Sequence, residues 1–371
     1  MTRIALALLR GVPHFESPRL KDPTGATATR TFLFDEMFEP RYDEATLELA
    51  PERVRAGRRG LPPWMQLALE VHRRRSEYDV VVTWGERLSL ALMALQRFSR
   101  SAKPHIPMMY WFSKPNVRLP MRAFGRSLHA IVTWSSFQRR YAVERLGVPA
   151  ERIYLVKHFV DQRFWTPRDC ATDMISAAGK EMRDYPTLLE SLEGTNLRCH
   201  IATDRVLVPG WFRNKSASTE GLVPAGMPNV SIGKMTSETE MRDLYARSRF
   251  TVVPVLPSDT DNGVTVILEA MAMGRPVICS RTRGQVDVIQ EGITGVLVPP
   301  GDPAALRTEL LSLWNDPERA RAMGRKARTH VEEHHTLEKF CSDVRRAVVT
   351  SVSGTQPSVA SGPRAHHVSA S

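Results

Sequence analysis

The sequence lacks a hydrophobic run of the roughly 18–20 residues needed to cross a bilayer. Its first apolar run, Ile4–Leu9, is too short for the core of a signal peptide and is closed by Arg10. We therefore expect a cytoplasmic protein in which this run is a buried strand. Cysteines are few and scattered without metal spacing, so we expect reduced thiols and no metal site. They are Cys170, Cys199, Cys279 and Cys341.

Acidic residues are scarce relative to basic ones. There are 51 Lys and Arg against 40 Asp and Glu, so the formal net charge is +11. Much of the excess is Arg in two clusters, at residues 53–59 and 73–75. Neither cluster has interleaved aromatic residues or a recognition motif, so we expect no nucleic-acid partner. A solvated face explains the charge most simply, and peripheral contact with an anionic membrane is the alternative.

Residues 251–300 carry the pattern on which the functional hypothesis depends. The apolar run Thr251–Leu256 predicts a buried strand, and a polar loop follows it. Gly263 ends that loop and a helical pattern begins. Gly274 and Pro276 then end the helix, as glycine and proline do just beyond a C-terminus. We therefore predict a strand, a loop and a short helix in succession.

Two acids flank the N-terminus of this predicted helix. Asp261 lies in the loop and Glu269 lies eight positions later, inside the helix. The backbone N–H groups of Gly263, Val264 and Thr265 fall in the first turn, where they lack intrahelical partners. Such an N-terminus attracts phosphate through free donors and the positive end of the helix dipole. With a carboxylate on each side to hold hydroxyls, the pattern predicts a site for a sugar joined to a diphosphate.

The stretch resembles the C-terminal signature of the retaining GT-B glycosyltransferases, in particular glycosyltransferase family 4 (glycosyl transferases group 1). The family pattern is an acid, seven residues, Glu, then usually Ala-Met-Ala and a Gly-(Lys/Arg)-Pro-Val strand entry. Here Asp261 is followed by seven residues and Glu269, and the two later motifs match at residues 270–272 and 274–277. The family usually has Glu in the first place, so Asp261 is one methylene shorter.

The resemblance implies an α/β protein with the GT-B fold, in which two Rossmann-like doubly wound domains face a central cleft. Repeated strand–helix alternation in the N-terminal half agrees with a parallel sheet. We divide the chain into an acceptor-side domain, a nucleotide-sugar-binding domain, a helix that returns to the first domain and a disordered tail. Their ranges are 1–165, 166–335, 336–350 and 351–371. The tail is rich in Ser, Pro, Gly and Ala and has no acid.

The resemblance also implies which residues bind the donor. Asp261 would hold hydroxyls of the transferred sugar, and Glu269 would hold the ribose. Lys180 and Arg183 occupy approximately the places from which the family supplies cations to the diphosphate. Fixed cations stabilise the charge that develops on a diphosphate leaving group. We therefore assign no metal and expect no cofactor beyond the nucleotide-sugar donor itself.

The remaining donor candidates contribute backbone contacts. Asn262 adjoins the helix N-terminus and belongs with the predicted phosphate cradle. Lys234 and Met235 follow a predicted strand where relatives hold the nucleotide base. Gly11 and Gly25 bound the first loop, and in the family a glycine-bearing loop there often approaches the donor phosphates. A plain turn is the alternative for both glycines, because glycine serves any position with positive φ.

The first domain departs from the family pattern at one place. Many relatives carry a His just after the strand that we predict at residues 107–112, but here Tyr110 and Trp111 stand in that segment. We assign this role to neither His105 nor His129, because a lone His is more often structural. Glu86 follows another predicted strand, at the end where open α/β sheets bind ligands. It is an acceptor-side candidate, with a solvent-facing loop acid as the alternative.

The leading hypothesis is a hexosyltransferase-type enzyme that moves a sugar from a nucleotide-diphosphate sugar to an acceptor with retention of configuration. The sequence names neither the sugar, the base nor the acceptor. A sugar-nucleotide epimerase or phosphorylase on the same fold is one alternative. A catalytically inactive binding subunit is another, favoured by the missing His and by Asp261. Arg- and Ala-rich composition suggests a bacterial protein acting on a cell-envelope glycan, a lipid-linked acceptor or a secondary metabolite.

Overall fold

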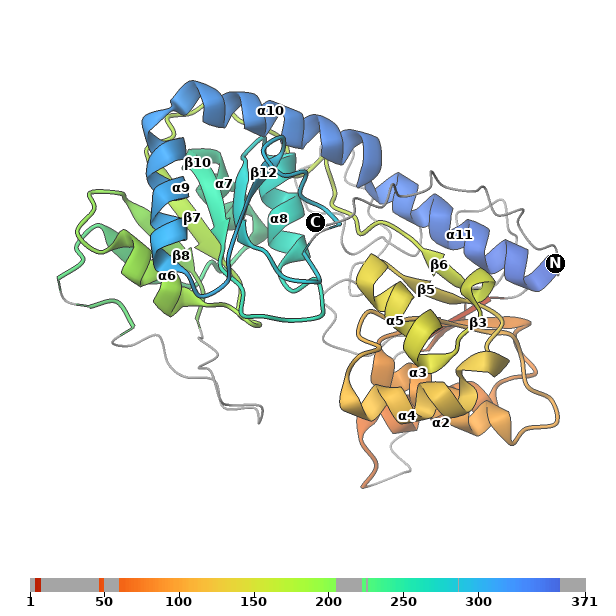
Figure 1. Cartoon of the computed structure of the whole chain (residues 1–371). Helices are drawn as coiled ribbons and strands as arrows, with labels where there is room; N and C mark the ends of the chain where they lie inside the picture. Colours follow the sequence, from red (N-terminus) through yellow and green to blue (C-terminus); the bar gives the residue numbers. More distant parts are fainter. Residues whose placement is uncertain are drawn as a thin grey trace, which may run out of the picture.

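The structure, a computed structural model, describes residues 4–7, 47–49, 60–204, 222–224, 226–285 and 287–353. In this part of the chain two six-stranded sheets form, and each lies among its own helices (Figure 1). Every strand pair in both sheets is parallel. Parallel pairing places the carboxyl ends of all strands of a sheet at one edge, which is where open α/β sheets bind ligands.

The first sheet has the order β2-β1-β3-β4-β5-β6. Its strands are β1 (Ile4–Ala7), β2 (Leu47–Leu49), β3 (Val80–Trp84), β4 (His105–Met108), β5 (Ile131–Thr133) and β6 (Ile153–Leu155). The helices between them are α2 (Pro63–Arg73), α3 (Glu86–Arg97), α4 (Pro115–Phe124) and α5 (Ser136–Leu146). The strand predicted at residues 107–112 is therefore shifted, because β4 ends at Met108 and Tyr110 lies beyond it.

The second sheet has the order β12-β11-β10-β7-β8-β9. Its strands are β7 (Met174–Ala178), β8 (Cys199–Ala202), β9 (Val230–Gly233), β10 (Ser248–Val253), β11 (Val277–Ser280) and β12 (Gly295–Val298). Its helices are α6 (Tyr185–Leu192), α7 (Glu238–Arg247), α8 (Val264–Ala272), α9 (Pro303–Asn315) and α10 (Pro317–His334). The predicted division at residues 165 and 166 falls between β6 and β7.

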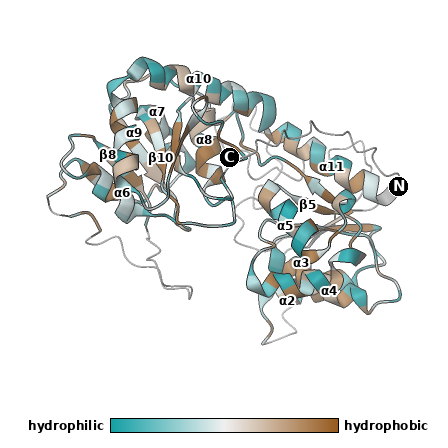
Figure 2. Ribbon diagram, in the orientation of Figure 1, coloured by the Kyte–Doolittle hydropathy of each residue, from teal (hydrophilic) through white to brown (hydrophobic). Residues whose placement is uncertain are grey.

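Each sheet is covered by a hydrophobic core on both faces. Val80 and Val82 of β3 join one core, whereas Val81 between them joins another. Successive side chains of a strand point to opposite faces, so a strand buried on both sides is apolar throughout. Figure 2 shows the same division, with hydrophobic strands inside and a mostly hydrophilic α10 outside.

The last helix, α11 (Leu337–Ser353), returns to the first sheet. Its Leu337, Phe340 and Val344 are buried in the core that contains β3 and β4, whereas α10 packs on the second domain. The chain passes between the domains near Val160 and again near His335. The two passages lie side by side, because the Val160 N–H donates to the His335 carbonyl at 2.9 Å. The helix ends at Ser353, so it extends into the segment predicted to be a disordered tail. Residues from 354 onward lie outside the described residues.

Local sequence signals account for the helix ends near the site. Ser237 caps α7 by accepting from the Glu240 N–H, as a serine followed three residues later by a glutamate favours. Gly274 has a φ of 68° just after α8, where a left-handed residue completes the helix end. No helix in the described part of the chain is long and apolar enough to cross a membrane. Gly11 and Gly25, predicted near the donor phosphates, lie outside the described residues, as does the Arg cluster at 53–59.

Candidate functional site

The centre of the predicted site is the turn from β10 into α8. Gly263 precedes the first residue of α8 with a φ of 105°, which strains any residue other than glycine. A Cβ atom at Gly263 would lie 2.8 Å from Cγ1 of Val253 and 3.2 Å from Nη2 of Arg183. The start of the helix is therefore pressed against a buried guanidinium, and only glycine permits that approach.

Arg183 is held rigidly beneath this helix start. Its Nε donates to the Ala178 carbonyl at 2.7 Å and its Nη1 donates to the Glu181 carbonyl at 2.8 Å. A Cβ atom at Gly179 would overlap the guanidinium, so Arg183 lies between two glycine backbones. Burial lowers its pKa from the ordinary value. The resemblance assigns this cation to the donor diphosphate, and in the structure it lies against the helix start predicted to bind phosphate.

The first turn of α8 offers fewer free donors than the sequence suggests. The Val264 N–H donates to the Asp261 carbonyl at 3.0 Å, so the turn itself already uses it. The intrahelical ladder begins with the Ile267 N–H, which donates to the Gly263 carbonyl at 3.0 Å. The Thr265 N–H precedes that first bond and keeps the position expected for anion binding.

Asn262 also differs from the expectation. Its side-chain amide donates to Oγ of Ser258 at 2.9 Å, and its own carbonyl accepts from the Gln285 side chain. Its polar groups therefore hold the loop together. Its predicted contact with the donor remains a prediction, and these bonds weigh against a side-chain contact.

Asp261 is a strongly perturbed acid of the site. The carboxylate accepts a hydrogen bond from the Trp134 side chain of the first domain, yet its Oδ2 has no hydrogen-bond partner among the described residues. Burial, followed by the nearby carboxylates of Asp287 and Glu86, raises its pKa to about 7. A buried carboxylate oxygen that lacks a donor is costly, so a ligand hydroxyl or amine would satisfy it.

Glu269 lies on the buried face of α8. The Tyr245 hydroxyl of α7 donates to its Oε2 at 3.1 Å. It lies eight positions along the chain from Asp261 and about one and a half helical turns after Val264, the first residue of α8. The two acids therefore occupy different environments, one at the junction of the domains and the other inside the second domain.

The remaining predicted residues lie further from the helix start. Nζ of Lys180 is 2.7 Å from Oδ1 of Asp204 at the end of β8. Lys234 and Met235 follow β9, and Met235 lines a hollow of about 590 Å³ together with α7. The structure thus brings Arg183 against Gly263 at the start of α8, whereas Lys180 and Met235 have other neighbours.

Asp259 and Asp261 have the Asp-X-Asp spacing that binds metal ions in many proteins. Their side chains have different neighbours here, since Asp259 faces Arg283 at 3.8 Å whereas Asp261 accepts from Trp134. In the part of the chain that the structure describes, no group of three or more His, Cys, Asp or Glu could hold a metal ion. The Asp-X-Asp spacing is therefore no reason to assign a metal site to these two residues.

Comparison with known proteins agrees with this geometry. Residues 182–316, which contain Arg183 and the whole of α8, match the family model described as glycosyl transferases group 1. The second domain belongs to the glycosyl transferases group 1. The two doubly wound domains joined by α11 are the GT-B fold.

Two curated relatives show how far the sequence similarity extends. The chain is 38% identical over 112 residues to the sulfoquinovosyl transferase SQD2 of Arabidopsis thaliana, but spans 21% of that protein's length. It is 23% identical over 312 residues to the GDP-mannose-dependent alpha-(1-6)-phosphatidylinositol monomannoside mannosyltransferase of Mycolicibacterium smegmatis. That alignment covers 76% of this chain and 80% of the relative.

Among solved structures, the fold resembles Anabaena Alr3699/HepE, determined in complex with UDP. The TM-score is 0.69 with 12% identity, and the match covers 94% of this chain and all of the other. At that identity the similarity establishes the fold alone.

The first domain of the GT-B fold contributes two aromatic residues to which the sequence pattern assigned no role. Tyr110 follows β4 and Trp134 follows β5, so both stand at the carboxyl edge of the sheet. Their rings stack with centroids 5.5 Å apart. The rule that ligands bind at this edge could have singled them out, because both come directly after short buried strands.

Glu86 is not the solvent-facing loop acid considered as its alternative. It is partly buried at the start of α3, and its Oε1 accepts from the Tyr110 and Trp111 N–H groups at 3.1 and 3.0 Å. Glu86 therefore fixes the segment in which a His was expected. His105 is buried and hydrogen bonded to Thr83, and burial lowers its pKa to about 3, as for a structural histidine.

The domains also contact one another directly beside Asp261. The Ser136 N–H at the start of α5 donates to Oδ2 of Asp287 at 2.8 Å. The Gln138 side chain donates to the Asp259 carbonyl at 2.6 Å. Residues 259 and 287 belong to the second domain, so these bonds hold the carboxyl edges of the two sheets together.

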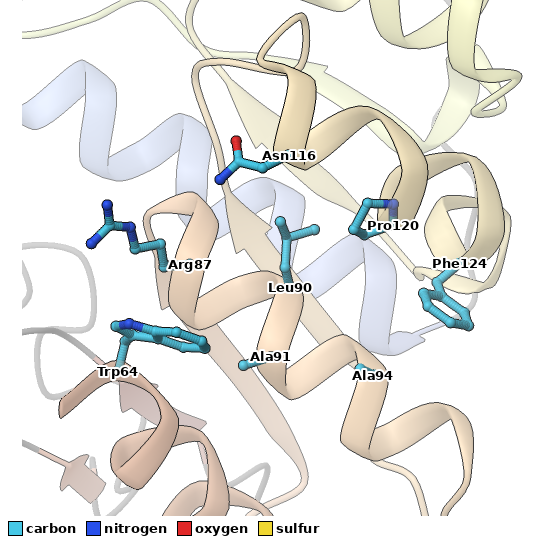
Figure 3. Close-up of a pocket in the computed structure, with 8 residues that line it drawn as sticks. All are labelled: Trp64, Arg87, Leu90, Ala91, Ala94, Asn116, Pro120 and Phe124. Atoms are coloured by element: carbon cyan, nitrogen blue, oxygen red, sulfur yellow. The ribbon is translucent and has the colours of Figure 1, made fainter. Parts of the chain in front are cut away.

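A separate groove of about 440 Å³ lies between α2, α3 and α4 (Figure 3). Arg87 and Asn116 lie toward one end and Phe124 toward the other, with Leu90, Ala91 and Ala94 of α3 along its floor. None of the residues predicted from the sequence to bind the donor lines this groove. Of the Arg cluster at 73–75, Arg73 and Arg74 pair with Glu70 and Glu77, as expected of a solvated face.

Proposed function

We propose that the protein is a glycosyltransferase that transfers a sugar from a nucleotide-diphosphate sugar to an acceptor with retention of configuration. The second domain binds the nucleotide, and the first domain contributes most of the acceptor site. The observation that carries the proposal is the close approach of the α8 N-terminus to Arg183, inside the segment that matches the glycosyl transferases group 1.

The chemistry of such a site follows from its charges. A nucleoside diphosphate gains negative charge as the glycosidic bond breaks, and a cation that is already fixed stabilises this charge without rearrangement. Arg183 is fixed by two carbonyls, and the Thr265 N–H lies at the positive end of α8. The HepE protein, which shares the fold, is described in complex with UDP, which supports a nucleoside diphosphate as the ligand.

The sugar would lie between the diphosphate and the first domain. Asp261 is placed to accept a sugar hydroxyl on its Oδ2, and Glu269 to accept ribose hydroxyls. Contacts between the domains beside Asp261 would exclude water and so favour transfer over hydrolysis. No metal is needed in this scheme, because Arg183 and the helix terminus supply the positive charge.

A ligand screen tests the donor site. The full chain is melted with UDP, GDP, ADP or TDP, each in large excess. A ligand at a hundred times its dissociation constant stabilises a protein by about 2.7 kcal/mol, which is readily seen as a shift in Tm. One nucleotide should stabilise the wild type, and Glu269→Gln should reduce that shift while preserving an oxygen for the Tyr245 hydroxyl.

Two further variants sharpen the screen. Asp261→Asn should leave the shift with the bare nucleotide intact, because its proposed contact is with the sugar. Glu144→Gln removes an exposed acid of α5 and serves as the control. If no nucleotide shifts the Tm of the folded wild type, the proposed donor site is wrong. If one does, the configuration of the product's anomeric carbon by NMR decides between retention and inversion.

A binding subunit without turnover is the second candidate. It is favoured by Tyr110, which stands where many relatives carry a His, and by Asp261 in place of Glu. This candidate predicts that the nucleotide sugar binds but is consumed neither with nor without an acceptor. Consumption without an acceptor would instead indicate an epimerase or a hydrolase.

A further inference from the structure

The positive charge of the chain is concentrated in one part of the first domain. Residues 60–155 contain 15 Lys and Arg against 6 Asp and Glu, so they carry a formal net charge of +9 out of the +11 of the whole chain. Within this range, residues 87–143 contain ten Lys and Arg and no acid. This stretch holds nearly all of α3 and the whole of α4. An anionic partner would therefore be attracted to this side of the molecule.

The same two helices carry the most exposed large hydrophobic side chains among the described residues. Phe98, directly after α3, is 83% exposed and Leu119 of α4 is 74% exposed, whereas no other exceeds 48%. A single exposed Leu is ordinary in a folded protein. Two apolar side chains that stand out in this way, on helices that pack against each other, indicate a surface that binds a partner.

The apolar groove between α2, α3 and α4 borders both positions (Figure 3). Ala94, one turn before Phe98, lies on its floor, and Pro120, next to Leu119, lies on its α4 side. The described residues that line the groove include no acid, and the charged one among them is Arg87. The groove therefore extends the apolar surface without adding negative charge.

Each of the two apolar side chains lies between a pair of exposed arginines. The pairs are Arg97 and Arg100 around Phe98, and Arg118 and Arg122 around Leu119. Arg118 and Arg122 donate to the backbone carbonyls of residues 113 and 145, contacts that do not neutralise their charge. Neither Arg97 nor Arg100 forms an ion pair with a described residue. The surface thus combines apolar tips with uncompensated positive charge.

An anionic lipid bilayer offers both kinds of group that such a surface binds. Its phosphates attract cationic side chains, and each Lys or Arg near the surface raises the affinity about fivefold. Directly beneath the phosphates lies an apolar layer that accepts Leu and Phe side chains. A nucleic acid would supply the phosphates but no apolar layer for Leu119. Charge complementarity and apolar exposure together therefore favour the bilayer.

We propose that the first domain docks on an anionic lipid bilayer through α3 and α4, with Phe98 and Leu119 inserted among the lipid chains and the neighbouring arginines on the phosphates. We call this set the docking surface, and it comprises Arg97, Phe98, Arg100, Arg118, Leu119 and Arg122. Two inserted side chains bury little apolar area, so the docking is reversible. The inference goes beyond the proposed function, because it does not depend on any nucleotide, sugar or acceptor.

Vesicle flotation with the full chain tests the inference without any nucleotide. The vesicles are phosphatidylcholine alone, or phosphatidylcholine with about 30% phosphatidylglycerol. The chain should bind the anionic vesicles at least about tenfold more tightly than the neutral ones. Raising the salt from about 50 mM to about 500 mM NaCl should weaken the binding, because it shortens the range of the attraction. Equal affinity for the two kinds of vesicle, or binding to neither, would overturn the inference.

Two double variants connect the binding with the docking surface. Phe98→Ser with Leu119→Ser should weaken binding to anionic vesicles about tenfold or more, because the inserted apolar area is lost. Arg97→Gln with Arg100→Gln should weaken it by a similar factor, from about fivefold for each charge. All four side chains are exposed, so neither variant should lower the Tm. Unchanged vesicle affinity in both variants would contradict the inference.

Matched substitutions in the second domain serve as controls. Leu311→Ser removes an exposed apolar side chain of α9, and Arg325→Gln with Lys326→Gln removes two charges from exposed positions of α10. Both should leave the vesicle affinity unchanged. A loss as large as that in the docking-surface variants would overturn the inference, because binding would then follow overall charge or hydrophobicity.

The outcomes also separate other partners and the proposed function. If the wild type ignores anionic vesicles but self-associates in sedimentation velocity, and the Phe98→Ser, Leu119→Ser variant does not, the surface joins copies of this chain and the inference is wrong. A chain that binds a nucleotide but no vesicle contradicts only this inference. A chain that binds anionic vesicles through the docking surface but no nucleotide supports the inference and contradicts the proposed function.

Discussion

The buried Asp261 carboxyl should make the protein less stable as the pH rises through the acidic range. Its pKa is about 7 in the folded protein, against an ordinary value of 3.8. Between these values the folded protein still holds a proton that the unfolded chain has released. The unfolded state therefore binds fewer protons, and the free energy of unfolding falls as pH rises from about 4 to about 7. Each pKa unit corresponds to about 1.36 kcal/mol, so the loss is up to about 4 kcal/mol.

Asp261→Asn removes this titration while preserving an oxygen for the Trp134 side chain. We expect the variant to match the wild type near pH 4 and to exceed its stability at pH 8 by up to about 4 kcal/mol, from the same pKa difference. Urea unfolding followed by fluorescence at closely spaced pH values measures the difference. Asp259→Asn is the matched control, because this acid lies in the same loop with its side chain 38% exposed.

One result would refute the reasoning. If the wild type and Asp261→Asn lose the same stability between pH 5 and pH 8, the carboxylate is ionised at low cost in the folded protein. The unpartnered Oδ2 would then be satisfied in solution without a ligand, and its proposed role toward the sugar would lose its physical basis.

Three further substitutions test the scaffold around the site. Gly263→Ala should cost more than Gly292→Ala, which has a similarly positive φ but open space around it. We expect Gly292→Ala to lower the free energy of unfolding by about 1–2 kcal/mol through backbone strain alone. Gly263→Ala should lower it further and weaken nucleotide binding, because Arg183 must move. Equal losses in the two variants would argue against the close approach of Arg183 to Gly263. Phe340→Ala should destabilise the first domain by about 3–5 kcal/mol in urea unfolding, since α11 completes its core. Ser237→Ala should cost about 1 kcal/mol in Tm measurements through loss of the α7 cap, and an unchanged Tm would show that the cap contributes nothing.

Much of the second domain could be predicted from the sequence because its signals are local. The apolar run into β10, the acid pair eight residues apart and the glycine after α8 are read from neighbouring residues. The cap at Ser237 depends on only four consecutive residues. These features follow from backbone geometry and hydrogen bonding within one or two helical turns, so they need no knowledge of the rest of the fold.

The acceptor side could not be read in the same way. Tyr110 and Trp134 stand far apart in the sequence, and they stack only because parallel pairing of β4 and β5 brings the ends of these strands together. The start of α8 was predicted correctly, but the hydrogen bond from the Val264 N–H to the Asp261 carbonyl depends on the exact path of the loop. No short-range pattern points to the contact of Asp287 with the Ser136 N–H at the start of α5, because the two residues lie 151 positions apart.

The sequence by itself predicted two doubly wound halves, from strand–helix alternation and from the resemblance to the GT-B enzymes. Short spacing and the same resemblance assigned a glycine, a cation and two acids to the second half. Tertiary structure alone decided which groups meet across the cleft. Hydrogen bonds join Asp261 to Trp134 and Asp287 to Ser136, although each pair is more than a hundred residues apart. Contacts of this kind depend on how the two domains pack. The order of neighbouring residues does not show which residues from different domains will meet.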